Sequence, residues 1–91
     1  MKSVRIYTTT YCSFCDRAKE LLRRKGIAFE EIDVTEDQEL RARLVEMTGG
    51  LRTVPQIWIG STHVGGYSDL ARLEREGRLD PLLRATAAAG A

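Results

Sequence analysis

Residues 4–26, VRIYTTTYCSFCDRAKELLRRKG, join a strand pattern, a cysteine pair and a helix pattern without a break. Val4 and Ile6 flank a charged residue, which is the alternation of a strand with one buried face. Ala18 and, three and four residues later, two leucines repeat with the spacing of the apolar face of a helix. The sequence therefore predicts a strand followed by an amphipathic helix, with both cysteines at the junction.

Two later helices have start signals of their own. Thr35 and Gln38 have the spacing of a capping box, and an apolar stripe that ends at Met47 follows them. Asp80 followed by Pro81 predicts a final helix with aspartate as its cap and proline as its first residue.

The complete order of predicted elements is strand, helix, strand, helix, strand, strand, helix, helix. Strands joined by a crossover helix are parallel, and residues 56–64 have the pattern of an antiparallel hairpin. We therefore predict an α/β fold, a four-stranded mixed sheet flanked by helices on both faces (βαβαββαα). The chain is expected to form a single domain over residues 1–91, with residues 85–91 as a frayed tail.

Composition excludes several classes of partner. The chain has 14 basic and 13 acidic residues, interspersed along its length, so neither nucleic acid nor an anionic membrane is an expected partner. Its longest apolar runs are a few residues, which predicts no membrane span and no targeting segment. We therefore expect a cytoplasmic location, where a cysteine pair is not expected to form a structural disulfide.

The cysteine pair has the arrangement of a redox motif beside a βαβ unit. Cys12 precedes the helix, where free backbone N–H groups and the helix dipole stabilise an anion. The thiolate is the reactive form of cysteine, so we predict that Cys12 is the nucleophile. Cys15 lies one turn further and is close enough to resolve a mixed disulfide formed on Cys12.

Other interpretations of the pair fit less well. A structural disulfide between the two cysteines would close a very small loop. A zinc site would need four ligands, and besides the two cysteines the sequence offers only His63 as a soft ligand. Two buried, inert cysteines conflict with the helix-start position and the polar neighbours. A cysteine hydrolase lacks support because the single histidine lies in a predicted strand. Trp58, Met47 and His63 are interpreted as core or sheet-face residues without a chemical role.

Three motifs in a fixed order extend the argument beyond the cysteines. They are Tyr11-Cys12-Ser13-Phe14-Cys15, Thr53-Val54-Pro55-Gln56-Ile57 and Gly65-Gly66-Tyr67-Ser68-Asp69. Together they resemble the glutaredoxin family, and the short bacterial dithiol members in particular, over residues 4–83. The resemblance implies a thioredoxin fold and a monomer that reduces protein disulfides and glutathione mixed disulfides, with glutathione as reductant. The implied partners are glutathione and disulfide-containing or glutathionylated proteins.

The resemblance also implies a glutathione site. The Val54–Pro55 bond would be cis, and the start of the helix after Gly66 would hold the γ-glutamyl carboxylate, which agrees with anion binding at helix N-termini. Asp69 would pair with the ligand's amino group. The implied glutathione-binding residues are Tyr11, Thr53, Val54, Pro55, Gly66, Tyr67, Ser68 and Asp69.

Two positions depart from the family pattern. Thr9 stands where many members have a lysine that contacts glutathione and favours the thiolate. Ser13 replaces the proline most often found between the cysteines. In the family, serine here is associated with members that bind a [2Fe–2S] cluster as glutathione-bridged dimers. The alternative function is therefore a cluster-binding dimer with Cys12 as the ligand.

Overall fold

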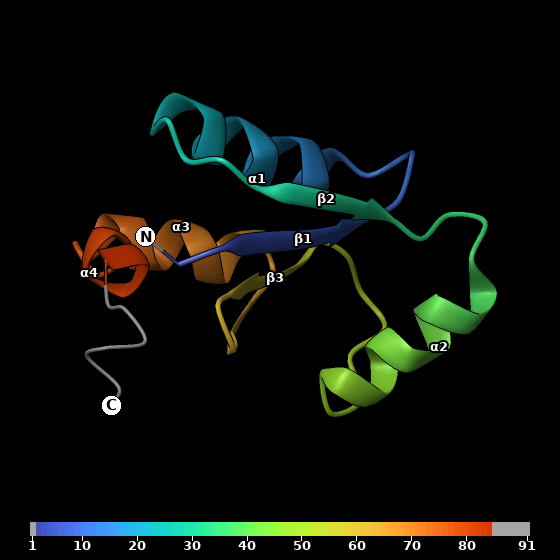
Figure 1. Cartoon of the computed structure of the whole chain (residues 1–91). Helices are drawn as coiled ribbons and strands as arrows, with labels where there is room; N and C mark the ends of the chain where they lie inside the picture. The colour runs from blue at the N-terminus through green and yellow to red at the C-terminus, as the bar shows by residue number, and fades with distance from the viewer. Residues whose placement is uncertain (1, 85–91) are drawn as a thin grey trace.

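The computed structural model describes residues 2–84, so the predicted tail over 85–91 lies outside the described residues. The elements follow one another in the predicted order (Figure 1). They are β1 (Val4–Thr8), α1 (Ser13–Arg24), β2 (Glu30–Asp33), α2 (Gln38–Met47), β3 (Gln56–Ile59), β4 (Thr62–Gly65), α3 (Tyr67–Arg75) and α4 (Leu79–Arg84). None of these helices is long and apolar enough to cross a membrane.

The four strands form one mixed sheet in the order β2-β1-β3-β4. β1 pairs with β2 in parallel, which places Tyr7 beside Ile32, and the crossover between them is α1. β3 runs antiparallel to both β1 and β4. The predicted mixed sheet is confirmed, and it places the C-terminal end of β1 next to the start of β3, where Tyr7 is opposite Gln56.

Alternating residues of the central strands divide the core between two faces of the sheet. Ile6 and Ile57 pack in a cluster with buried residues of α1, α3 and α4. Tyr7 and Trp58 face the other way and pack with Leu44 of α2. Helices therefore cover both faces of the sheet, as predicted. Figure 1 shows α2 near the C-terminal end of β1, whereas α3 and α4 lie toward its N-terminal end.

The first helix ends where the sequence predicts. Gly26 has φ of 70°, a conformation that favours glycine, and its N–H donates to the carbonyl oxygen of Arg23. The next N–H, of Ile27, donates to the carbonyl of Leu22, and the Ile27 side chain is buried in the core. This hydrophobic contact after the glycine turns the chain back toward β2.

The predicted start of the second helix is wrong by two residues. Asp37, not Thr35, is the N-cap of α2, and its carboxylate accepts a hydrogen bond of 2.9 Å from the N–H of Leu40. The Thr35 hydroxyl instead accepts from the backbone N–H of Thr10 at 2.7 Å. Met47 is 47% exposed rather than part of the core, because it is the last residue of the helix and Leu44 is its buried residue.

The last helix begins at Leu79, two residues before Pro81, its predicted first residue. Leu79 is fully buried, so burial of this side chain fixes the start of the helix. Asp80 therefore lies in the first turn, where its carboxylate is 3.0 Å from Nζ of Lys25. The same ammonium group is 2.9 Å from Glu74, so Lys25 links the end of α1 to α3 and α4.

Candidate active site

Cys12 is the N-cap of the twelve-residue helix α1, in extended conformation with φ of −147° and ψ of 103°. Its Sγ accepts a hydrogen bond of 3.1 Å from the backbone N–H of Cys15. The sulfur thus takes the place of the oxygen in an ordinary N-cap, at the positive end of the helix dipole. Cys12 as a residue is partly exposed, unlike the buried Cys15.

The Cys12 sulfur also contacts the loop before β3. Its thiol donates to the carbonyl oxygen of Val54 at 3.6 Å, a contact between residues 42 apart in the chain. The Val54–Pro55 peptide bond is cis, as the resemblance implied. Thr53 is exposed, Val54 is partly buried and Pro55 is buried, so the loop runs from the surface into the core as it passes the Cys12 sulfur.

Cys15 differs from Cys12 in its surroundings. It is 1% exposed, which contradicts the expectation that the helix start keeps both cysteines out of the core. Burial, with a smaller contribution from Cys12, raises the pKa of the Cys15 thiol from 9.0 to about 12. At neutral pH this thiol is therefore protonated. Cys15, Ala18 and Leu22 lie on the buried side of α1, and their spacing of three and four residues is the signal that could have predicted the burial.

The glycine pair at the end of β4 brings the start of α3 next to the loop before β3. Gly66 is the N-cap of α3, and its N–H donates to Oδ2 of Asp69 at 3.0 Å. A Cβ atom on Gly66 would lie 3.6 Å from the carbonyl oxygen of Pro55, so the two backbones are close. Asp69 is half-buried and Ser68, the second residue of α3, is exposed. The structure therefore places the predicted motif from Gly66 to Asp69 beside the loop that contains Pro55.

Exposed aromatic side chains flank Cys12 in the chain. Tyr11 is 97% exposed in the loop before α1, and Phe14 in the first turn is 54% exposed. The rings of Phe14 and Tyr67 stack with centroids 6.2 Å apart, which joins α1 to the start of α3. The guanidinium group of Arg17 lies 5.5 Å from the centroid of the Phe14 ring.

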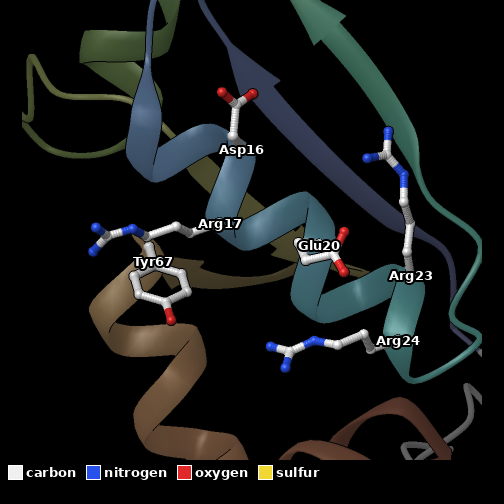
Figure 2. A pocket seen from close by; sticks show the side chains of 6 residues that line it. All are labelled: Asp16, Arg17, Glu20, Arg23, Arg24 and Tyr67. Atoms are coloured by element: carbon white, nitrogen blue, oxygen red, sulfur yellow. The ribbon is translucent and has the colours of Figure 1, made fainter.

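A groove of about 400 Å³ continues from this stack along the surface of α1. Figure 2 shows Arg17 beside the ring of Tyr67, Arg24 extended toward the same side, and Asp16 directed away from both. The residues that line the groove are Asp16, Arg17, Glu20, Arg23, Arg24 and Tyr67. Three arginines and two carboxylates therefore line this surface, whose first residue along α1, Asp16, lies four residues after Cys12.

The family model described as Glutaredoxin matches residues 4–64, which is more than half of the chain. The chain belongs to the glutaredoxin family. The matched residues contain both cysteines and the cis-proline loop, and with these two cysteines the glutaredoxin family supports the activity of a thiol–disulfide oxidoreductase.

Individual glutaredoxins match over most of their length. A glutaredoxin of Pseudomonas aeruginosa is 58% identical over 85 residues, which are 93% of this chain and 100% of the relative. The solution structure of glutaredoxin from Brucella melitensis is 55% identical with a TM-score of 0.83, over 92% of this chain and 90% of that one. A crystal structure of a buckwheat glutaredoxin–glutathione complex is 32% identical with a TM-score of 0.84, over 90% of this chain and 76% of that one. The predicted thioredoxin fold is confirmed.

Two polar residues behind the loop had no predicted role in this glutaredoxin. Gln56 is 1% exposed although it opens an otherwise apolar strand, and its side chain is bonded to both Thr53 and His63. A glutamine at a buried strand position is the signal that could have drawn attention to it, because buried amides are kept only with hydrogen-bond partners.

Proposed function

We propose that this protein reduces protein disulfides and glutathione mixed disulfides, with glutathione as the reductant and Cys12 as the nucleophile. The single observation that carries the proposal is the contrast between the two sulfurs. Cys12 is partly exposed and its Sγ accepts the Cys15 N–H at 3.1 Å, whereas Cys15 is buried and its thiol has a raised pKa. One sulfur is therefore arranged to react first and the other to remain protonated.

The first step with a glutathionylated protein is attack of the Cys12 thiolate on the sulfur of the bound glutathione. A Cys12–glutathione disulfide forms, the protein–glutathione disulfide breaks, and the protein leaves as a thiolate that takes a proton from water. A second glutathione thiolate then attacks the glutathione sulfur of the intermediate. Glutathione disulfide leaves and Cys12 returns as a thiolate. The reaction consumes one free glutathione thiol, and the other half of the glutathione disulfide is the glutathionyl group that came from the protein.

Protein disulfides can use the second cysteine. Attack of Cys12 on the disulfide gives a mixed disulfide with the protein, which the Cys15 thiolate displaces to form the Cys12–Cys15 disulfide. Two glutathione molecules then reduce that bond. Because burial raises the pKa of Cys15, its thiol has to lose a proton before this attack, so resolution by glutathione is favoured in the resting geometry.

The glutathione site is proposed for the surface between the Pro55 loop and the start of α3. Thr53 and Val54 would pair with the peptide part of glutathione, Pro55 would support the loop, and Tyr11 would cover the ligand. The N-terminus of α3 would bind the γ-glutamyl carboxylate through its free N–H groups. The residues proposed there are Gly66, Tyr67, Ser68 and Asp69. The buckwheat relative in complex with glutathione supports this class of ligand.

The [2Fe–2S] alternative stays a prediction that the comparisons do not favour. The residues present would supply one thiolate per chain, Cys12, because Cys15 is buried and protonated. Within residues 2–84 no group of three or more histidine, cysteine or acidic side chains could hold a metal ion. A cluster would therefore need two chains and two added thiolates, and iron analysis of anaerobically purified protein, with its oligomeric state, tests this.

The remaining expectations are part of the same proposal. Glutathione is abundant in reducing compartments, so we place the protein in the cytoplasm, acting as a monomer on disulfide-containing or glutathionylated proteins. Cell fractionation and sedimentation of the purified protein test these two points.

The deciding experiment is glutathione-coupled reduction of a small mixed disulfide by wild type, Cys12→Ser and Cys15→Ser. We expect Cys12→Ser to be inactive and Cys15→Ser to keep activity, because glutathione can clear the intermediate without Cys15. A wild-type protein that shows no activity with glutathione would contradict the proposed function. Loss of activity in Cys15→Ser with a normal melting temperature would contradict the glutathione route.

A further inference from the structure

The cis-proline loop is held from behind by a chain of side-chain hydrogen bonds. Nε2 of Gln56 donates to the carbonyl oxygen of Thr53 at 3.0 Å and lies 3.3 Å from its hydroxyl oxygen. Oε1 of the same amide is 2.7 Å from Nε2 of His63. The chain thus runs from β4 through the first residue of β3 to the loop that contacts Cys12.

Each member of this chain has a fixed orientation. The Gln56 oxygen can only accept, so Nε2 of His63 has to carry the hydrogen. If His63 carried its hydrogen on Nδ1 instead, two acceptors would face each other at 2.7 Å. Because Gln56 is 1% exposed, water cannot replace a lost partner without a cost in stability.

The imidazole is itself held by aromatic packing. His63 is opposite Trp58 in the hairpin, and the two rings stack with centroids 4.5 Å apart. Trp58 in turn meets Tyr7 of β1 edge to face, with centroids 5.4 Å apart. The hydrogen-bond chain is therefore anchored to the centre of the sheet and not to a mobile surface.

We propose that Gln56 and His63 are positioning residues for glutathione. They act through Thr53: the amide of Gln56, oriented by His63, fixes the loop in the position that receives the peptide part of the ligand. A loop held before the ligand arrives loses less conformational entropy on binding. This inference rests on the proposed function, because it assigns a role to residues behind the proposed glutathione site.

The test is the steady-state kinetics of His63→Phe, which keeps a ring to stack on Trp58 but removes the N–H that Gln56 accepts. We expect the KM for glutathione to rise about fivefold, the ratio that corresponds to one ordinary hydrogen bond. The kcat at saturating glutathione should stay near the wild-type value, because the lost interaction supports binding and not the transfer step. His63→Gln, whose amide can donate to Gln56, should recover part of the affinity.

A matched control separates positioning from a general loss of stability. Ile57 lies between Gln56 and Trp58 on β3, is fully buried and faces the opposite side of the sheet. Ile57→Val should lower the melting temperature and leave the KM for glutathione unchanged. If Ile57→Val raises the KM for glutathione as much as His63→Phe does, the rise in KM reflects a general loss of stability, and the positioning role is wrong.

A spectroscopic readout tests the same bond without kinetics. The ¹⁵N chemical shifts of the neutral His63 ring should show the hydrogen on Nε2, and a ring protonated on Nδ1 would overturn the proposal. The positioning role and the proposed function can be overturned separately. An active wild type with an unchanged KM in His63→Phe overturns the positioning role alone. A wild type that does not use glutathione overturns the proposed function and the role together.

Discussion

The carboxylate of Asp69 occupies the space that a side chain on Gly65 would need. A Cβ atom built on Gly65 would collide with Oδ2 of Asp69, the same oxygen that accepts the N–H of Gly66. Gly65 also has φ of 114°, which L-residues rarely adopt. The cap of α3, and with it the proposed carboxylate site, therefore depends on glycine at this position.

Gly65→Ala should consequently be more harmful than an alanine at an equally strained but open position. Gly50 has the same φ of 114° with nothing within 4 Å of a built Cβ, so Gly50→Ala is the control. We expect Gly50→Ala to cost about 1–2 kcal/mol in unfolding free energy from backbone strain. Gly65→Ala should cost about 1–3 kcal/mol more and weaken glutathione binding, because Asp69 has to move. Equal costs in urea unfolding would contradict the collision.

The buried thiol of Cys15 predicts a loss of stability at high pH. The unfolded thiol releases its proton near the ordinary pKa of 9.0, whereas the folded thiol holds it to about 12. Between these values the folded state binds more protons than the unfolded state. The contribution of the Cys15 proton to the free energy of unfolding is therefore complete below pH 9.0 and falls as the pH rises toward 12. Cys15→Ala should lack that fall, and its deficit relative to wild type should shrink as the pH rises from 9 to 11. Ile6→Val, a core change without a thiol, should keep a constant deficit.

A second titration should appear at low pH. Lys19 donates to Glu31 at 2.9 Å and the Thr8 hydroxyl donates to the same carboxylate oxygen at 2.8 Å, so the pKa of Glu31 lies below its ordinary 4.5. Its stabilisation is complete above pH 4.5 and is lost as the pH falls through the lower folded value. Glu31→Gln should cost about 1 kcal/mol at neutral pH and flatten the acid limb of the unfolding curve. Glu30→Gln, a neighbouring exposed carboxylate on β2, should leave that limb unchanged.

The arginines beside Phe14 and Tyr67 should influence which substrates react. Arg17→Glu reverses a charge at the end of the groove shown in Figure 2, two turns or less from Cys12. We expect kcat/KM to fall about fivefold for a glutathionylated peptide flanked by aspartates and to rise for one flanked by lysines. Small neutral disulfides should be unaffected, and the difference should shrink at high salt. Arg43→Glu on α2 has the same change in charge, and an equal effect there would exclude a local role for the groove.

Periodic patterns predicted the elements well because each buried face repeats along its own segment. The apolar spacing of α1, which includes Ala18 and Leu22, placed that helix on the sheet correctly. The cis bond before Pro55 came from the resemblance, since nothing local in the sequence distinguishes it from an ordinary proline at the start of a strand.

The features that were missed depend on contacts between distant residues. The cap of α2 moved to Asp37 because the Thr35 hydroxyl is engaged by Thr10, 25 residues away. The bond between Gln56 and His63 crosses a hairpin and carries no periodic signal. A sequence read segment by segment gives the donors and acceptors, but only the fold determines which of them meet.

The burial of Cys15 makes the protein its own reporter of structural opening. The chain has two cysteines, one partly exposed and one 1% exposed. An alkylating reagent should therefore attach one group to the native protein quickly and a second only when α1 separates from the sheet. The rate of the second addition measures the frequency of that opening, as hydrogen exchange does for backbone amides. Ligands that tighten the site should slow the second addition without changing the number of reactive sulfurs.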